Sequence, residues 1–152
     1  MAGRFPINIP KEKDYIRRLY EDQGKMNLAI VLKDGDRHIG GAGINDIQAV
    51  HRVATYGIVI GEKDCWSKGY GSEVTGMVVR HGFSTLNLNR ISLNVYDFNT
   101  RAIRVYEKAG FKREGVLRKA LYVEGAYRDI LIMGILREEW DRKSQVRGAC
   151  EW

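Results

Sequence analysis

The chain has 152 residues, of which 44% are hydrophobic and 29% are charged, a composition that excludes a disordered protein and fits one folded domain over residues 1–152. Its longest apolar runs, such as ILIMGIL, are too short to span a bilayer, and MAGRFPINIP lacks the apolar segment of a signal peptide, so we expect a cytoplasmic protein. The net charge of +6 favours an anionic partner, but charge alone does not choose between a nucleic acid, a membrane surface and a phosphorylated cofactor.

The first half of the chain predicts one helix and three strands. Residues 11–23 place Tyr15, Ile16, Leu19 and Tyr20 at helical spacing, which predicts an amphipathic helix with a charged outer face. Two apolar segments on either side of Asp34 and Gly35 predict a hairpin, and a third apolar segment predicts a further strand. These strands are expected over 27–33, 37–44 and 53–61.

The second half begins with a helix that ends before Asn87, indicated by Val74, Met77, Val78 and His81 at intervals of three and four. RISLNVY predicts a strand, and Asn99 is placed to cap a helix from Thr100 to Ala109 that closes with Gly110 and Phe111. Two segments around Glu124 and Gly125 predict a closing hairpin over 111–123 and 127–136. The order predicts an α/β (α+β) fold with a mixed, mostly antiparallel central sheet flanked by helices, with a core over about 27–140 and a flexible tail over 141–152.

The two cysteines, Cys65 and Cys150, stand far apart and show no metal-ligand spacing, so we interpret them as free thiols and expect no metal. No histidine or lysine in the local pattern is placed to activate Cys65. We therefore interpret Cys65 as chemically inert.

The segment WSKGYGSE, residues 66–73, joins the third strand to the next helix and predicts an anion site. A glycine loop at a helix N-terminus presents unpaired backbone N–H groups and the positive end of the helix dipole. Gly69 and Gly71 let the backbone approach phosphate oxygens, while Ser72 offers a hydroxyl and Lys68 a charge. Val74 stands where a dinucleotide fingerprint needs a third glycine, and a tight turn without a ligand remains an alternative.

Taken together, the loop, RISLNVY and NTRAIRVYEKAGF resemble the GCN5-related N-acetyltransferase (GNAT) superfamily, especially its branch that acetylates ribosomal protein N-termini and polyamines. The resemblance covers about residues 27–140 and implies the fold of acyl-CoA N-acyltransferases and an acetyl-CoA-dependent transfer to a primary amine. Family members usually begin with a further strand and helix, for which MAGRFPINIP is too short. The residues implied in cofactor binding are Ile58, Val59, Ile60, Trp66, Lys68, Gly69, Tyr70, Gly71, Ser72, Asn94, Asn99, Arg101, Ala102, Tyr106 and Lys108.

The resemblance also implies catalytic roles. Tyr106 corresponds to the acid that protonates the departing sulfur, and its alternative is a tyrosine packed on the sheet. Some members carry a glutamate where this chain has Asn94, and an amide cannot take a proton. Glu62 is the best substitute base; a solvated loop carboxylate, or no dedicated base at all, are the alternatives.

The acceptor side is expected to include Asp46, Tyr122, Tyr127 and Asp129, the last three around the turn of the closing hairpin. An open sheet edge left by the short N-terminus predicts a homodimer. Two other functions stay open: a non-catalytic acyl-CoA binder and a nucleic-acid binder. The nucleic-acid binder is favoured by the charge and opposed by the lack of a dense Lys/Arg tract.

Overall fold

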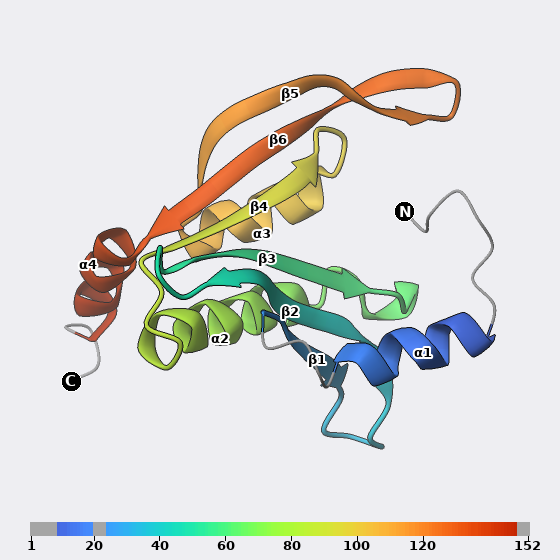
Figure 1. The fold of residues 1–152 in the computed structure, drawn as a ribbon, viewed down its shortest axis with the longest axis horizontal. Helices are drawn as coiled ribbons and strands as arrows, with labels where there is room; N and C mark the ends of the chain where they lie inside the picture. The colour runs from blue at the N-terminus through green and yellow to red at the C-terminus, as the bar shows by residue number, and fades with distance from the viewer. Residues whose placement is uncertain (1–8, 20–23, 149–152) are drawn as a thin grey trace.

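The computed structural model describes residues 9–19 and 24–148, which form a six-stranded sheet with helices on both of its faces (Figure 1). The sheet order is β1-β2-β3-β4-β6-β5. The elements are α1 (Ile9–Leu19), β1 (Met26–Val31), β2 (His38–Gln48), β3 (Val53–Ile60), η1 (Lys63–Cys65), α2 (Tyr70–Ser84), β4 (Arg90–Tyr96), α3 (Thr100–Ala109), β5 (Lys112–Val123), β6 (Ala126–Leu136) and α4 (Arg137–Gly148). The predicted class, with its mixed and mostly antiparallel sheet, is confirmed.

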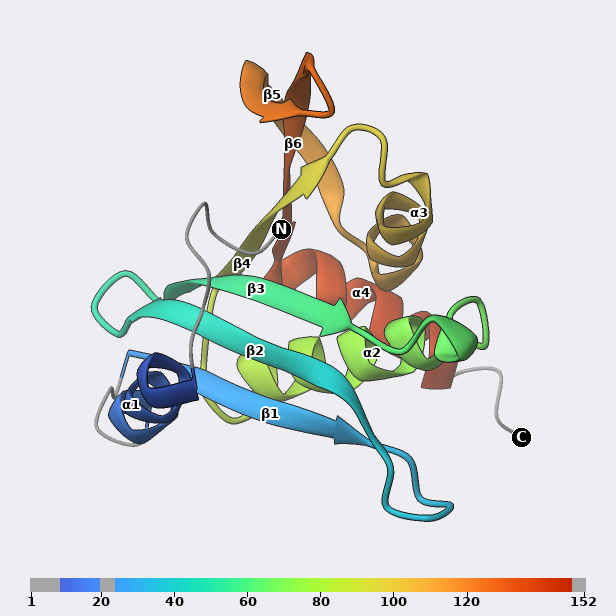
Figure 2. The same cartoon turned by 90° about the vertical axis from the view of Figure 1, so that its right-hand side faces the viewer.

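The sheet parts in its middle. Strands β3 and β4 are parallel and pair only from Val53↔Arg90 to Thr55↔Ser92, although β3 continues to Ile60 and β4 to Tyr96. All other neighbouring strands are antiparallel, and β4 pairs with β6 along its whole length. The free ends of β3 and β4 therefore diverge, as Figure 2 shows, and open a gap that the cleft described below occupies.

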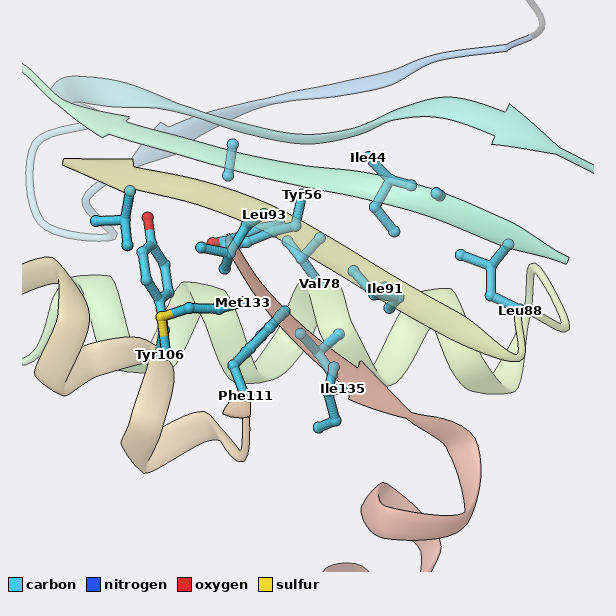
Figure 3. Packing of buried hydrophobic residues seen from close by; sticks show 14 of the residues in the cluster. Ile44, Tyr56, Val78, Leu88, Ile91, Leu93, Tyr106, Phe111, Met133 and Ile135 are labelled. Atoms are coloured by element: carbon cyan, nitrogen blue, oxygen red, sulfur yellow. The ribbon is translucent and has the colours of Figure 1, made fainter. Parts of the chain in front are cut away.

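The core lies between the sheet and the helices α2 and α3. Phe83, Val79 and Val78 on the inner face of α2 are buried against Ile44 of β2 and Ile91 of β4, together with the apolar residues labelled in Figure 3. Burying each side chain of this size contributes about 1.5–3 kcal/mol relative to exposure. A Cβ on Gly82 would come within 2.8 Å of Ile91 Cδ1, so glycine is what allows α2 to approach the sheet this closely.

Most predicted elements agree with the structure to within one or two residues, and RISLNVY and Thr100–Ala109 agree at both ends. The first helix was expected over 11–23 and is observed over Ile9–Leu19; residues 20–23 lie outside the described part of the chain. The inner face of α2 also differs from the expected one, because Met77 is half-exposed while Thr75 and Phe83 are buried.

The helix α4 was not predicted, since 141–152 was expected to be a flexible tail. It continues from β6 to Gly148 and is held at its start by the carboxylate of Glu139, which accepts a hydrogen bond from the Leu136 N–H at 3.0 Å. Its Trp140 ring lies 5.4 Å from that of Phe83. The Arg137 side chain also donates to the Phe83 and Leu88 carbonyls. Capping and long-range contacts therefore hold a helix that no apolar periodicity predicts; residues 149–152 lie outside the described part.

No helix in the described ranges is long and apolar enough to cross a membrane. Within the same ranges, no group of three or more His, Cys, Asp or Glu side chains is arranged to hold a metal ion.

Candidate active site

A cleft of about 500 Å³ opens where β3 and β4 part. One wall is the end of β3 with the loop that follows it and the start of α2. The other wall is the end of β4 and one face of α3. The cleft is lined by Ile58, Val59, Ile60, Cys65, Trp66, Ser67, Gly69, Tyr70, Gly71, Ser72, Tyr96, Asn99, Arg101, Ala102, Val105 and Tyr106.

The glycine loop places backbone donors at the N-terminus of α2. Gly69 is the N-cap with φ 91°, a left-handed conformation that favours glycine, and no side chain caps the helix. The amides of Ser72 and Glu73 donate to the Gly69 carbonyl at 2.9 and 3.1 Å. The amides of Gly69, Tyr70 and Gly71 make no backbone hydrogen bond with any described residue, so three donors at the N-terminus of this 15-residue helix are available to a ligand. The Ser72 amide already has a partner, so the predicted contribution of Ser72 is its hydroxyl.

Gly71 keeps the cleft open at this point. A Cβ built on Gly71 would meet the Ile60 Cδ1 at 3.8 Å and the Val105 Cγ2 at 3.9 Å, which are ordinary contact distances. Ile60 belongs to one wall and Val105 to the other, so a larger side chain here would fill the space between the walls. The geometry fits a diphosphate that approaches the backbone closely.

Trp66 and Arg101 bridge the two walls. The indole Nε1 donates to the Ile60 carbonyl at 2.8 Å, and the Arg101 guanidinium lies 4.1 Å from the ring centre in a cation–π contact. This hydrogen bond engages the carbonyl of Ile60, one of the residues that the resemblance implied in cofactor binding. Trp66 and Arg101 both line the cleft.

We expect coenzyme A to change the fluorescence of Trp66, because the ring lines the cleft and its cationic neighbour is a natural partner for phosphate. Titration of the protein with coenzyme A, with excitation of tryptophan, measures this change. Trp66→Phe is the control, since Trp140 and Trp152 remain in it. An undiminished signal in Trp66→Phe would mean that the ligand is sensed elsewhere.

Tyr106 lies deep in the cleft, on the inner face of α3, and is 6% exposed. Its ring stands edge-on to Tyr56 at 6.2 Å and to Phe111 at 5.9 Å. Burial raises the pKa of its hydroxyl above the ordinary 10.0, so the phenol keeps its proton at neutral pH. The hydroxyl forms no hydrogen bond with any described residue, which leaves its proton available to a ligand.

Comparison with known proteins identifies the family. The Acetyltransferase (GNAT) domain profile matches residues 2–112. The uncharacterized N-acetyltransferase YokL of Bacillus subtilis, derived from the SPbeta prophage, is 31% identical over 137 residues, covering 89% of this chain and 77% of YokL. The chain belongs to the GNAT acetyltransferase family.

Two further similarities involve a polyamine enzyme. The spermidine N(1)-acetyltransferase of Vibrio cholerae is 30% identical over 116 residues, covering 76% of this chain and 66% of that protein. A dodecameric structure of spermidine N-acetyltransferase from Vibrio cholerae superposes with a TM-score of 0.82 at 25% identity, covering 90% of this chain and 79% of that one. The expected GNAT fold is therefore confirmed, and the protein is an acetyl-CoA-dependent N-acetyltransferase.

The GNAT cleft includes most, but not all, of the expected cofactor residues. Lys68, Asn94 and Lys108 do not line it. The Asn94 side chain is exposed on β4, and the Lys108 carbonyl accepts a hydrogen bond from Lys143 Nζ at 2.5 Å. Asn99 caps α3 by accepting from the Ala102 N–H at 3.2 Å, as predicted.

Sequence reasoning missed four lining residues, Cys65, Ser67, Tyr96 and Val105. Tyr96 was recognisable as the last residue of the strand before the Asn99 helix. Cys65 is a buried free thiol, in agreement with the interpretation of a free thiol. No local pattern indicates that it faces the cleft.

Glu62 does not reach the cleft. Its carboxylate accepts a hydrogen bond from Arg37, which also donates to Asp64 at 2.8 and 3.0 Å. The hydrogen bonds to Arg37 hold the pKa of the Asp64 carboxyl below its usual value. Glu62 instead borders a second hollow of about 890 Å³ on the opposite face of β1–β3, beside Ile16 of α1.

The expected acceptor residues lie at different ends of the sheet. Asp46 lies near Asn45↔Thr55, at the end of β2 away from the cleft. Tyr122 and Tyr127 face each other at 5.0 Å near the tip of the β5–β6 hairpin, beyond the end of β4. Asp129 accepts a hydrogen bond from the Lys119 N–H at 2.8 Å and so stabilises an irregularity in β5.

Proposed function

We propose that the cleft between β3 and β4 holds acetyl-CoA and that Tyr106 donates the proton needed when coenzyme A leaves. One observation carries the proposal: three unpaired amides at the N-terminus of α2 and the free Tyr106 hydroxyl lie in the same cleft, between walls formed by the parted strands. The amides can donate hydrogen bonds to a diphosphate, and the Tyr106 hydroxyl can supply a proton.

Acetyl-CoA supplies an acetyl thioester, whose acetyl group passes to the amine. The chain supplies the groups that bind the cofactor. Gly69, Tyr70 and Gly71 offer backbone donors, and the Ser72 hydroxyl and Arg101 guanidinium lie along the same cleft. Arg101 is a further candidate for phosphate because, among the described residues, its partner is an aromatic face. The Arg101 guanidinium in the cleft supports an anionic cofactor, in line with the net charge of +6.

We infer that solvent, rather than a side chain, takes the proton of the amine. None of the described residues that line the cleft is Asp, Glu or His. Glu62 is paired with Arg37 outside the cleft, and Asn94 cannot accept a proton. At saturating acetyl-CoA, kcat/KM is therefore expected to rise about tenfold per pH unit below the pKa of the acceptor amine and then level off. A plateau set by a group titrating near pH 4–6, whatever the amine, would indicate a carboxylate base.

A small cationic primary amine is the acceptor class that we propose. Support comes from the spermidine acetyltransferase among the relatives, while protein N-termini remain the second candidate. The test is the release of free coenzyme A thiol from acetyl-CoA in the presence of spermidine, spermine, an aminoglycoside or a peptide with a free N-terminus. Binding of coenzyme A without thiol release for any of these acceptors would favour the non-catalytic acyl-CoA binder.

We further propose a homodimer built on the β5–β6 hairpin. Figure 1 shows this hairpin extending past the end of β4, and a two-stranded ribbon is marginally stable by itself in water. Its surface carries Val116, Leu117, Tyr122 and Tyr127, exposed by 51%, 43%, 57% and 65%. Such an apolar surface is typical of an interface.

The protein is accordingly expected to elute as a dimer or larger assembly in size-exclusion chromatography with light scattering. Val116→Lys combined with Leu117→Lys is expected to shift it to the monomer mass. The matched control is Val50→Lys, an equally apolar residue that is 90% exposed in a turn. A wild-type protein that elutes as a monomer would contradict the proposal.

A further inference from the structure

A buried pair of hydroxyl groups connects the glycine loop to the aromatic cluster around Tyr106. Thr75 is fully buried on the inner face of α2, one turn after Gly71. Its Oγ1 lies 2.6 Å from the Gly71 carbonyl oxygen and 3.0 Å from the Tyr56 hydroxyl. Thr75 is the one polar residue in the buried core of the described chain.

The directions of these two hydrogen bonds follow from counting protons. A carbonyl oxygen can only accept, so the single proton of the Thr75 hydroxyl goes to Gly71. The Tyr56 hydroxyl must then be the donor to Thr75 Oγ1. The Tyr56 proton is committed to an internal partner, and burial raises the pKa of this phenol strongly. Of the two neighbouring tyrosines, only Tyr106 has a proton to give.

The Tyr56 ring in turn contacts the ring of Tyr106. The two centroids are 6.2 Å apart and the planes are perpendicular, while Tyr56 lies nearly parallel to Phe111 at 6.3 Å. Figure 3 shows the three rings together, with Tyr106 rising from α3 toward the sheet. Edge-to-face pairs have a preferred geometry, so a Tyr56 ring that is anchored at its hydroxyl restricts the orientation of Tyr106.

We propose that Thr75 and Tyr56 form a positioning pair that holds the Tyr106 hydroxyl in the cleft. Thr75 and Tyr56 do not line the cleft themselves, so they act through Tyr106 and not on a ligand. This inference rests on the proposed role of Tyr106. It predicts that removing either hydroxyl affects turnover through Tyr106, with cofactor affinity preserved.

The experiment is a double-mutant cycle. Tyr56→Phe and Thr75→Val each remove one hydroxyl with little change of shape, and Thr75→Ser is the conservative control that keeps both hydrogen bonds. Each is made in the wild type and in Tyr106→Phe, and kcat, the KM for acetyl-CoA and the Kd for coenzyme A are measured. We expect kcat to fall about five- to tenfold in Tyr56→Phe and Thr75→Val, with the Kd changed less than about twofold and Thr75→Ser close to wild type. In the Tyr106→Phe background, Tyr56→Phe is expected to have no further effect.

The proposal is overturned if Tyr56→Phe lowers kcat by the same factor in the wild type and in Tyr106→Phe. It is also overturned if Tyr56→Phe keeps the full kcat. In either case the pair does not act through the Tyr106 hydroxyl. If Thr75→Val fails to fold, Tyr56→Phe carries the test. NMR spectra of protein with 13C-labelled tyrosine test the positioning of Tyr106 independently of its proposed role as the acid. The Tyr106 ring signals, assigned by their loss in Tyr106→Phe, should shift in Tyr56→Phe but not in Thr75→Ser, whether or not Tyr106 proves to be the acid. Unchanged signals in Tyr56→Phe would also overturn the positioning role.

Discussion

Tyr106→Phe is expected to lower kcat at least about a hundredfold, since a positioned general acid contributes about 10²–10⁴-fold to a rate. This corresponds to about 2.7 kcal/mol of transition-state stabilisation. The Tyr106 hydroxyl bonds to no described residue, so its removal leaves no buried group unsatisfied. The measurement is steady-state thiol release at saturating acetyl-CoA and amine.

The fold should tolerate this substitution. Phenylalanine keeps the ring that packs edge-on to Tyr56 and Phe111, so the melting temperature and the coenzyme A affinity should stay close to those of the wild type. The pH profile adds a second readout. The acid acts in its protonated form, and burial raises its pKa, so this group should cause no loss of rate below about pH 10 in the wild type. Full turnover in Tyr106→Phe at every pH would show that another donor protonates the leaving group.

Gly71→Val is expected to weaken coenzyme A binding about a hundredfold without unfolding the protein. The added Cβ has room in the free protein, because it meets Ile60 and Val105 only at ordinary contact distance, and the valine methyl groups extend into the cleft between them. They then occupy the space that a diphosphate needs to reach the loop amides. A hundredfold loss corresponds to about 2.7 kcal/mol, and losing one or two hydrogen bonds to a charged group, each worth roughly 1.5–3 kcal/mol, accounts for it.

Gly76→Val is the matched control. Gly76 belongs to the same helix, does not line the cleft, and has no atom within 4 Å of an added Cβ. Both variants place the same residue in α2, so the difference between their coenzyme A affinities, measured by isothermal titration calorimetry, isolates the cleft. Equal affinities in the two variants would contradict a phosphate site at Gly71.

These two results also discriminate between the functions that the sequence left open. A nucleic-acid binder would keep its affinity for nucleic acid in both Gly71→Val and Tyr106→Phe. This affinity would fall steeply with salt concentration. A non-catalytic acyl-CoA binder would be impaired by Gly71→Val only. An acetyltransferase requires both Gly71 and Tyr106.

The sequence alone determined the features that depend on short stretches of chain. Asn99 and Gly110 indicate the ends of α3, because caps act within one helical turn. Gly69 and Gly71 indicate the loop, because the backbone conformation of a loop depends on the residues in it. The family resemblance rests on the same local patterns. The apolar periodicity predicted every strand of the sheet, but α4 lacks that periodicity and was missed.

Only the tertiary structure decided which side chains meet. Arg37 comes from the β1–β2 turn and donates a hydrogen bond to Glu62, although 25 residues separate the two. Trp66 reaches the Ile60 carbonyl and Arg101, and Thr75 reaches Tyr56 across the core. These contacts depend on where β3 and β4 part and on how α2 and α3 pack beside them. Such long-range packing is set by the whole core, so no local sequence pattern encodes it.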